Sequence, residues 1–85
     1  MMLTIAIGAD DAATDLRNVV KSHLQAKGYE VVDFSRDIGD NALIYPDIAF
    51  NLASAVGDGI YPRGILLCGT GIGMAIVANK VPGVR

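Results

Sequence analysis

Short apolar runs and helical apolar repeats alternate along the whole chain. The runs at residues 3–7 and 65–67 are continuous, as in strands buried on both faces of a parallel sheet, and the run at 29–34 is rich in β-branched and aromatic residues. Apolar residues recur at helical spacing over 12–24 and 48–56, and the apolar segment 74–78 also looks helical. The pattern therefore predicts the order strand–helix–strand–helix–strand–helix.

The first predicted helix should bury one apolar face. Asp10 or Asp11 is suited to cap its start, because a carboxylate accepts hydrogen bonds from the unpaired N–H groups of a first turn, and Gly28 is suited to end it. The face that we expect in the core consists of Ala12, Leu16, Val19, Val20 and Leu24. The residues that we expect on the other faces, as solvated charges and polar groups, are Arg17, Lys21, Gln25 and Lys27.

The second predicted helix opens at Tyr45-Pro46-Asp47, because proline is well placed in a first turn. Gly57 and Gly59 should end it. The positions that repeat at helical spacing and should face the core are Ile48, Ala49, Leu52, Ala53 and Val56.

This order of elements predicts an α/β fold, a three-layer α/β/α, Rossmann-like domain around a parallel sheet. A strand order of 2-1-3 places the topological switch point between the first and third strands, where open sheets of this kind bind ligands. The turns at residues 8–11 and 68–73 should meet there. The third strand would be an unpaired apolar edge, which is a hazard for aggregation. We therefore expect residues 1–85 to be the N-terminal part of a single, longer domain, or a partner to complete the sheet.

Composition narrows the class of protein. The 85 residues are 52% hydrophobic and 19% charged, with a formal net charge of −2, which fits one small domain with a buried core. There is no basic patch for nucleic acid, and no apolar run approaches the roughly 18 residues of a membrane span. The start of the chain lacks the basic region of a signal peptide, and one cysteine forms no internal disulfide, so we expect the reducing cytoplasm.

The stretch at residues 64–75 is the strongest candidate for chemistry. It is predicted to run from a strand, through a turn with alternate glycines, into a helix. Gly69, Gly71 and Gly73 would let backbone N–H groups approach a ligand, and a helix N-terminus attracts anions. The spacing is neither the dinucleotide-binding fingerprint nor a P-loop, and tight packing alone would also explain the glycines.

Cys68, at the end of the third predicted strand, has two interpretations. A lone cysteine is often a small buried hydrophobic residue. At a strand end beside a helix N-terminus, the thiolate form is favoured and the residue becomes a candidate base or nucleophile. The residues around it leave both interpretations open.

Other polar residues are weaker candidates. Asp10 and Asp11 are explained more simply as helix caps than as ligands, and Tyr45 is either a packing residue or a hydroxyl donor at the mouth of the crevice. His23 should be an exposed helical residue. One histidine and one cysteine form no zinc spacing and no catalytic triad. The polar loop at 35–43 is explained more simply as a solvated surface loop than as part of a site, although four of its residues could reach a ligand: Arg36, Asp37, Asp40 and Asn41.

The motif Cys68-Gly69-Thr70-Gly71-Ile72-Gly73, followed by Ala78-Asn79-Lys80, resembles the ribose-5-phosphate isomerase B / galactose-6-phosphate isomerase family. The segment 5–10 and the pair Tyr45-Pro46 are also similar, so the resemblance covers the whole chain. It implies an aldose–ketose isomerase of phosphorylated sugars that needs no metal and acts through an enediolate.

The resemblance also implies roles for single residues. Cys68 matches the base that moves a proton between C1 and C2, and Thr70 matches the motif threonine beside that site. Asp10 matches an aspartate that contacts sugar hydroxyls, with Asp11 next to it in the same turn, and Tyr45 matches a tyrosine that lines the pocket. The N–H donors that would hold the enediolate oxygen belong to the turn that contains Gly69, Gly71, Ile72 and Gly73.

Two departures from the family pattern matter. Ring-opening members commonly carry Asp-His where this chain has Asp10-Asp11. A four-carbon ketose phosphate has no ring to open, and residues 68–85 are similar to the erythrulose-phosphate isomerase branch, so a tetrulose phosphate joins ribose and ribulose 5-phosphate as a candidate substrate.

The second departure is length. The family's domain continues with two more strands, a histidine and phosphate-binding arginines, and its members are dimers with shared active sites. The resemblance thus implies a homodimer or a dimer of dimers, and a chain that ends at Arg85 is expected to be inactive alone. A non-catalytic phosphosugar-binding module, or an inactive fragment on the same scaffold, is the alternative.

Overall fold

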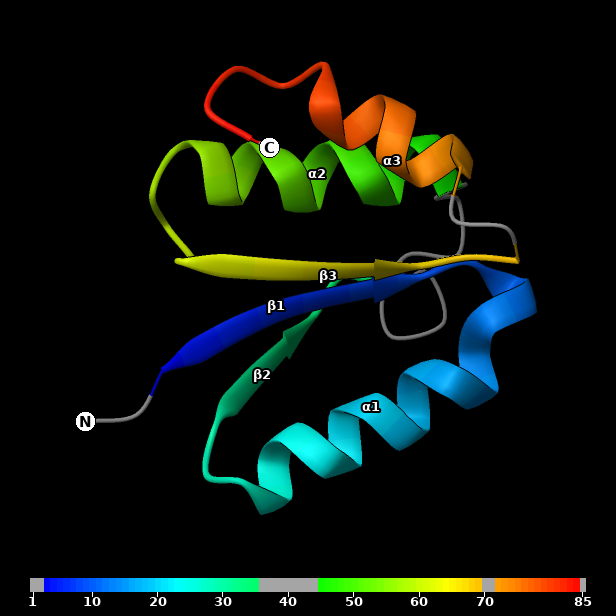
Figure 1. The fold of residues 1–85 in the computed structure, drawn as a ribbon, viewed down its shortest axis with the longest axis vertical. Coiled ribbons are helices and arrows are strands. Elements are labelled where there is room, and N and C mark those ends of the chain that lie inside the picture. The colour runs from blue at the N-terminus through cyan, green and yellow to red at the C-terminus, as the bar shows by residue number, and fades with distance from the viewer. Residues whose placement is uncertain (1–2, 36–44, 70–71, 85) are drawn as a thin grey trace.

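Three parallel strands form a sheet that is covered by helices on both faces in the computed structural model (Figure 1). The structure describes residues 3–35, 45–69 and 72–84, and for Asp11, Tyr45, Pro46 and Ile72 it describes the backbone alone. The strands are β1 (Thr4–Ala9), β2 (Glu30–Asp33) and β3 (Arg63–Leu67). The helices are η1 (Asp11–Ala13, a short 3-10 helix), α1 (Thr14–Ala26), α2 (Tyr45–Gly57) and α3 (Ile72–Asn79).

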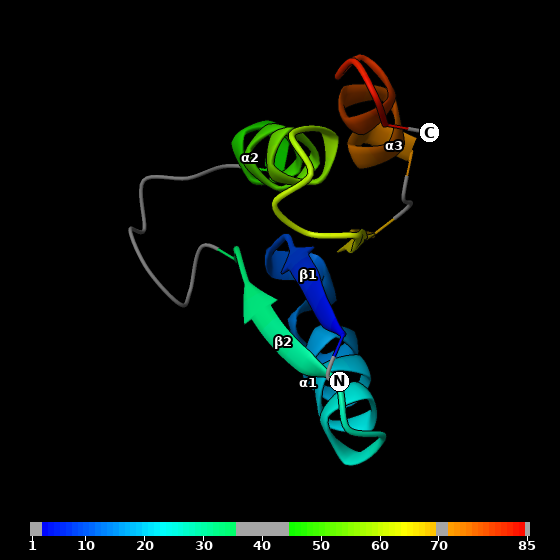
Figure 2. The ribbon, with the colours of Figure 1, turned by 90° about the vertical axis from the view of Figure 1, so that its left-hand side faces the viewer.

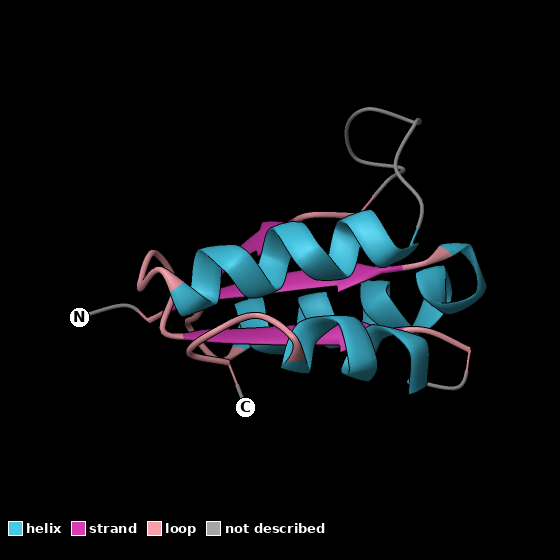
Figure 3. Ribbon diagram, turned by 90° about the horizontal axis from the view of Figure 1, so that it is seen from above, coloured by secondary structure: helices cyan, strands magenta, loops and turns pink. Residues whose placement is uncertain are grey.

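The layers confirm the predicted α/β/α architecture. The sheet has the order β2-β1-β3, with β1 in the centre, and both pairs are parallel. α1 covers one face, and α2 and α3 lie side by side over the other (Figures 2 and 3). No helix in the described ranges is long and apolar enough to cross a membrane.

The core lies between β1 and the pair α2 and α3. The apolar residues of β1 are buried, and Ile48, Ala49 and Met74 form a cluster against which Leu66 and Cys68 pack. The predicted apolar face of α2 is confirmed, since Ile48, Ala49, Leu52 and Ala53 are all buried.

Close contact between α2 and the sheet depends on a glycine in β1. A Cβ atom at Gly8 would lie 2.8 Å from Cγ2 of Ile48 and 3.3 Å from Cδ2 of Leu66. Contacts between carbon atoms are normally about 3.5 Å or longer. The missing side chain at Gly8 therefore lets α2 approach the centre of the sheet.

The predicted buried face of α1 is wrong. Leu16 is 53% exposed and Val19 is 66% exposed, whereas Arg17, expected in solvent, is buried. Nε of Arg17 lies 3.5 Å from Oδ2 of Asp33 on β2, and Nζ of Lys21 lies 3.2 Å from the same oxygen. A buried carboxylate needs cations or hydrogen-bond donors, so α1 turns its basic residues toward the sheet.

Among the described residues, β3 has a paired strand on one side only. Arg63 and Gly64 are exposed, and the apolar run at residues 65–67 is partly buried. The prediction of an apolar edge strand is confirmed for this part of the chain. The prediction that this run is buried on both faces is wrong for the described residues, because residues 65–67 are only partly buried. No described strand pairs with the free edge of β3.

Candidate active site

The turns that follow β1 and β3 meet at the carboxyl end of the sheet, the end at which α2 and α3 begin (Figure 1). The backbone N–H of Asp10 donates to the carbonyl oxygen of Leu67, with 3.1 Å between nitrogen and oxygen. A Cβ atom at Gly69 would lie 3.7 Å from Cβ of Ala12, which is ordinary contact. Because Cys68 follows Leu67, its backbone adjoins that of Asp10. The predicted meeting of the two turns is therefore confirmed.

Asp10 caps η1, as its position predicts. Its backbone is extended, with φ −80° and ψ 177°, and its Oδ1 accepts a hydrogen bond of 3.2 Å from the N–H of Ala13. No other described residue donates to this half-buried carboxylate. One carboxylate oxygen is thus used to cap η1, and no described residue donates to the other.

Cys68 directly follows Leu67, the last residue of β3, and begins the turn. It is half-buried, forms no disulfide, and packs against the cluster of Ile48, Ala49 and Met74. This packing supports the interpretation as a small core residue, while the remaining exposure leaves the residue accessible at the crevice. The local geometry is therefore compatible with both predicted roles.

The glycine-rich turn is shorter than predicted. α3 begins at Ile72, so Gly73 belongs to the first helical turn and not to the segment before it. The first N–H groups of a helix have no acceptor within the helix and carry partial positive charge. Gly69 is exposed, and Thr70 and Gly71 lie outside the described residues. Available donors near Cys68 thus include the first-turn amides of α3.

Several predicted candidates can be placed only by their backbone. Tyr45 starts α2 and Asp11 starts η1, both at the carboxyl end of the sheet, and Ile72 starts α3 (Figure 1). His23 is exposed on α1, as predicted. The loop candidates lie outside the described residues: Arg36, Asp37, Asp40 and Asn41.

Two buried polar residues near the crevice were missed from the sequence. Ser35, assigned to a solvated loop, is only 3% exposed, and its Oγ accepts a hydrogen bond of 2.9 Å from the N–H of Ala9. Asp33, assigned to a strand, accepts at Oδ1 from the N–H of Ser35, also at 2.9 Å. An aspartate that bonds the backbone two residues later is a known turn pattern, so Asp33-Phe34-Ser35 carried a usable signal.

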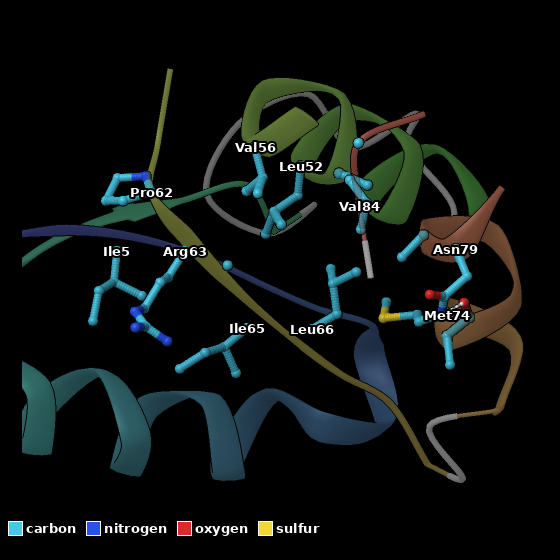
Figure 4. A pocket seen from close by; sticks show the side chains of 15 residues that line it. Ile5, Leu52, Val56, Pro62, Arg63, Ile65, Leu66, Met74, Asn79 and Val84 are labelled. Atoms are coloured by element: carbon cyan, nitrogen blue, oxygen red, sulfur yellow. Dashed lines mark hydrogen bonds between the residues drawn. The ribbon is translucent and has the colours of Figure 1, made fainter. Parts of the chain in front are cut away.

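A groove formed by described residues lies elsewhere, along the outer edge of β3 beneath α2 and α3 (Figure 4). It encloses about 690 Å³, and neither Asp10 nor Cys68 lines it. Within the described ranges, no three His, Cys, Asp or Glu side chains lie close enough together to hold a metal ion. The groove is mainly apolar, unlike a site for a polar sugar phosphate, and its lining includes Leu52, Val56, Ile65, Leu66, Met74 and Val84.

Comparison with protein families identifies the chain's relatives. Residues 5–85 match the model of the family described as Ribose/Galactose Isomerase. The chain belongs to this family. The match includes both turns of the crevice and the whole motif around Cys68, so the resemblance seen in the sequence is confirmed.

The relatives include enzymes named for different sugar phosphates. The chain is 61% identical to the D-erythrulose-4-phosphate isomerase of Pectobacterium atrosepticum, over 99% of this chain and 55% of the relative. It is 43% identical to the ribose-5-phosphate isomerase B structure of Clostridium thermocellum, with a TM-score of 0.87 over 98% of this chain and 55% of that one. A structure from Mycoplasma genitalium, described with bound ribulose-5-phosphate, is 39% identical, with a TM-score of 0.84 over 99% of this chain and 56% of that one. The chain thus spans about half the length of these relatives.

Proposed function

We propose that residues 1–85 supply the proton-transfer end of an aldose–ketose isomerase domain that acts on a phosphorylated sugar through an enediolate. The observation that carries the proposal is the hydrogen bond between Asp10 N–H and Leu67 O, because it joins a carboxylate turn to the strand end that bears Cys68. Family membership supports it, and the fold agrees with solved isomerases at TM-scores of 0.84 and 0.87.

In the proposed reaction, the Cys68 thiolate removes a proton from the carbon next to the substrate carbonyl. The electron pair of that C–H bond forms the C1–C2 double bond of an enediolate, and the carbonyl oxygen takes the negative charge. The hydroxyl proton on the oxygen of the deprotonated carbon then passes to the former carbonyl oxygen, and the electron pair left on the oxygen that lost this proton forms the new carbonyl. The electron pair of the C1–C2 double bond takes the same carbon-bound proton, or one exchanged with water, from sulfur at the neighbouring carbon. No atom is gained or lost, and one sugar carbon is oxidised as the other is reduced.

The enediolate charge is the main barrier in such a step, so N–H donors fixed at the developing oxyanion lower it. A preorganised donor of this kind is typically worth about 3–4 kcal/mol. We assign this role to amides of the turn and of the first turn of α3, with Gly69, Gly71, Ile72 and Gly73, and we place Thr70 beside them. The α3 N-terminus supports the assignment, because the first N–H groups of a helix have no acceptor within the helix.

We assign sugar recognition to Asp10 and Tyr45, with Asp11 in the same turn as Asp10. A four-carbon ketose phosphate, erythrulose 4-phosphate, is the substrate we favour over ribulose 5-phosphate. The identity of 61% to the D-erythrulose-4-phosphate isomerase supports this choice. The family resemblance adds that ring-opening members commonly carry histidine where this chain has Asp11.

We propose that the phosphate-binding groups of the enzyme belong to the part of the relatives that this chain does not match, since the match covers 55% of each relative. The family resemblance is the basis for two further proposals: a homodimer or a dimer of dimers with shared active sites, and a location in the cytoplasm. Light scattering on the full-length gene product measures the subunit number, and a monomer that is fully active contradicts a shared site.

The test of the proposal is the Cys68→Ala variant of the full-length gene product. In deuterated water, the wild-type enzyme should exchange the proton at C2 of the aldose phosphate, and the variant should lose this exchange while keeping its circular dichroism spectrum. Cys68→Ser, which keeps the size of the side chain but is a much weaker base, is the matched variant and should be similarly impaired. Exchange of the C2 proton at the wild-type rate by Cys68→Ala would contradict the proposed role of the thiol.

The alternative is a phosphosugar-binding module without catalysis. The packing of Cys68 against the core cluster favours it, because a cysteine used only for packing needs no reactivity. The rate of reaction with iodoacetamide, measured against pH, separates the two. An inert thiol, together with sugar-phosphate binding but no proton exchange, supports the module.

A further inference from the structure

Ser35 holds one side of the Asp10 turn. Its Oγ accepts the hydrogen bond from the N–H of Ala9, the last residue of β1 and the neighbour of Asp10. The pairing of β1 with β2 ends at Ile7 and Asp33, two residues before Ala9 and Ser35. At Ala9, the hydrogen bond to the Ser35 side chain takes the place of a backbone hydrogen bond between the strands. On the other side, the N–H of Asp10 is bonded to Leu67 on β3.

Asp33 in turn fixes the position of Ser35. Its Oδ1 accepts from the N–H of Ser35, and its Oδ2 lies 3.2 Å from Nζ of Lys21 and 3.5 Å from Nε of Arg17. The side chains of Arg17 and Asp33 are each 4% exposed. Both basic residues belong to α1, which follows Asp10 through η1.

These contacts close into a ring around Asp10. Starting at Asp10, the path runs along η1 and α1 to the basic residues, across the ion pairs to Asp33, and through Ser35 and Ala9 back to Asp10. Every side-chain contact in the ring is buried or partly buried, where hydrogen bonds are little weakened by water. The ring leaves the Asp10 backbone little freedom on the side away from Cys68.

We propose that Ser35 is a positioning residue for substrate binding, which acts through the carboxylate of Asp10 and has no substrate contact of its own. This inference rests on the proposed function. Without Oγ, the N–H of Ala9 is left unpaired in a buried place, and the turn shifts or loosens to regain a partner. The carboxylate then meets the sugar hydroxyls in a poorer position.

The expected signature is a change in KM. Asp10 is proposed to contact hydroxyls that do not react, so its contribution is nearly the same in the ground state and the transition state. Ser35→Ala should therefore raise KM about 5-fold, the size of one typical hydrogen bond, and change kcat by less than 2-fold. Ser35→Thr keeps the hydroxyl and should stay within about 2-fold of the wild-type KM, and Ser22→Ala, exposed on α1, is the matched control.

A double-mutant cycle in the full-length gene product decides whether Ser35 acts through Asp10. If it does, Ser35→Ala should raise KM for erythrulose 4-phosphate in the wild-type background and leave it unchanged in the Asp10→Ala background. Equal effects in both backgrounds overturn the inference alone. A wild-type enzyme inactive with erythrulose, ribulose, allulose and tagatose phosphates overturns the proposed function and this inference with it. If Ser35→Ala does not fold, Ser35→Cys, whose sulfur is a weaker acceptor, carries the same cycle.

Discussion

Nε of Arg17 lies 3.5 Å from Oδ2 of Asp33, and both side chains are 4% exposed. This ion pair joins α1 to β2 and sets which face of α1 points to the sheet. Leu16 and Val19, at neighbouring positions of the same helix, are consequently turned outward. Asp33 is also linked to the Asp10 turn, because it accepts from the N–H of Ser35, and Ser35 accepts from the N–H of Ala9.

Breaking this pair should cost much stability. Asp33→Ala removes the buried carboxylate that faces the guanidinium of Arg17, which also donates to Oδ1 of Asn18. Removing one partner of a buried ion pair typically costs about 3–5 kcal/mol in the free energy of unfolding. Urea unfolding measures the loss. Asp58→Ala, in the exposed turn after α2, is the control and should change stability by no more than about 0.5 kcal/mol. Equal losses in the two variants would show that the Arg17–Asp33 pair is unimportant.

Substitution of Gly8 should loosen the packing of α2. In Gly8→Ala, the new Cβ would meet Cγ2 of Ile48 at 2.8 Å, and overpacking of this kind costs about 1–3 kcal/mol. Thermal unfolding of the single variants and of Gly8→Ala with Ile48→Ala gives the coupling, and the double variant should lose less than the sum of the two. Gly69→Ala is the matched change, since among the described residues its Cβ would meet only Ala12, at 3.7 Å, and it should leave stability unaltered or slightly higher. Strict additivity at Gly8 and Ile48 would contradict the close contact.

The two roles of Asp10 should separate between two variants. Asparagine caps a helix about as well as aspartate, so Asp10→Asn should retain stability, whereas Asp10→Ala should lose about 1 kcal/mol. Both remove the negative charge proposed to bind sugar hydroxyls, and both should lower kcat/KM by about 10- to 100-fold. Unfolding curves and initial rates with the full-length gene product measure the two effects. An Asp10→Asn enzyme with normal kcat/KM would leave Asp10 as a helix cap only.

The residue after Asp10 should influence the choice of substrate. Asp11→His restores the residue that ring-opening relatives commonly carry, so we expect kcat/KM for ribose 5-phosphate to rise relative to that for the four-carbon erythrose 4-phosphate. The ratio of the two kcat/KM values is the measurement. Asp15→His, on the exposed first turn of α1, is the control and should leave the ratio unchanged. A ratio that is the same in all three enzymes would remove Asp11 from the account of specificity.

The sequence was sufficient to predict the strands and helices and their order along the chain. Continuous apolar runs predicted β1 and β3, and the helical repeat at 48–56 predicted α2 with its buried face, because each pattern is local and has a fixed period. The switch point also followed from local rules, since few arrangements of alternating strands and helices are allowed. The meeting of the Asp10 and Cys68 turns could therefore be predicted, and the family motif directed attention to Cys68.

The face of α1 could not be predicted from the helix alone. Residues 12–24 offer one stripe with Leu16 and Val19 and an adjacent stripe with Arg17 and Val20, and apolar content favours the first. In the folded chain the second stripe faces the sheet, because the buried carboxylate of Asp33 on β2 needs the basic side chains of α1.

Periodicity and turn residues thus determined the strands, the helices, their order and the place where the chemistry would gather. The tertiary structure alone decided how α1 is rotated, that Ser35 supports the end of β1, and that α3 begins early enough to include Gly73. The physical reason is that a local pattern reflects the period of one element, while the partner of a buried polar group is chosen by neighbours brought together only in the folded chain.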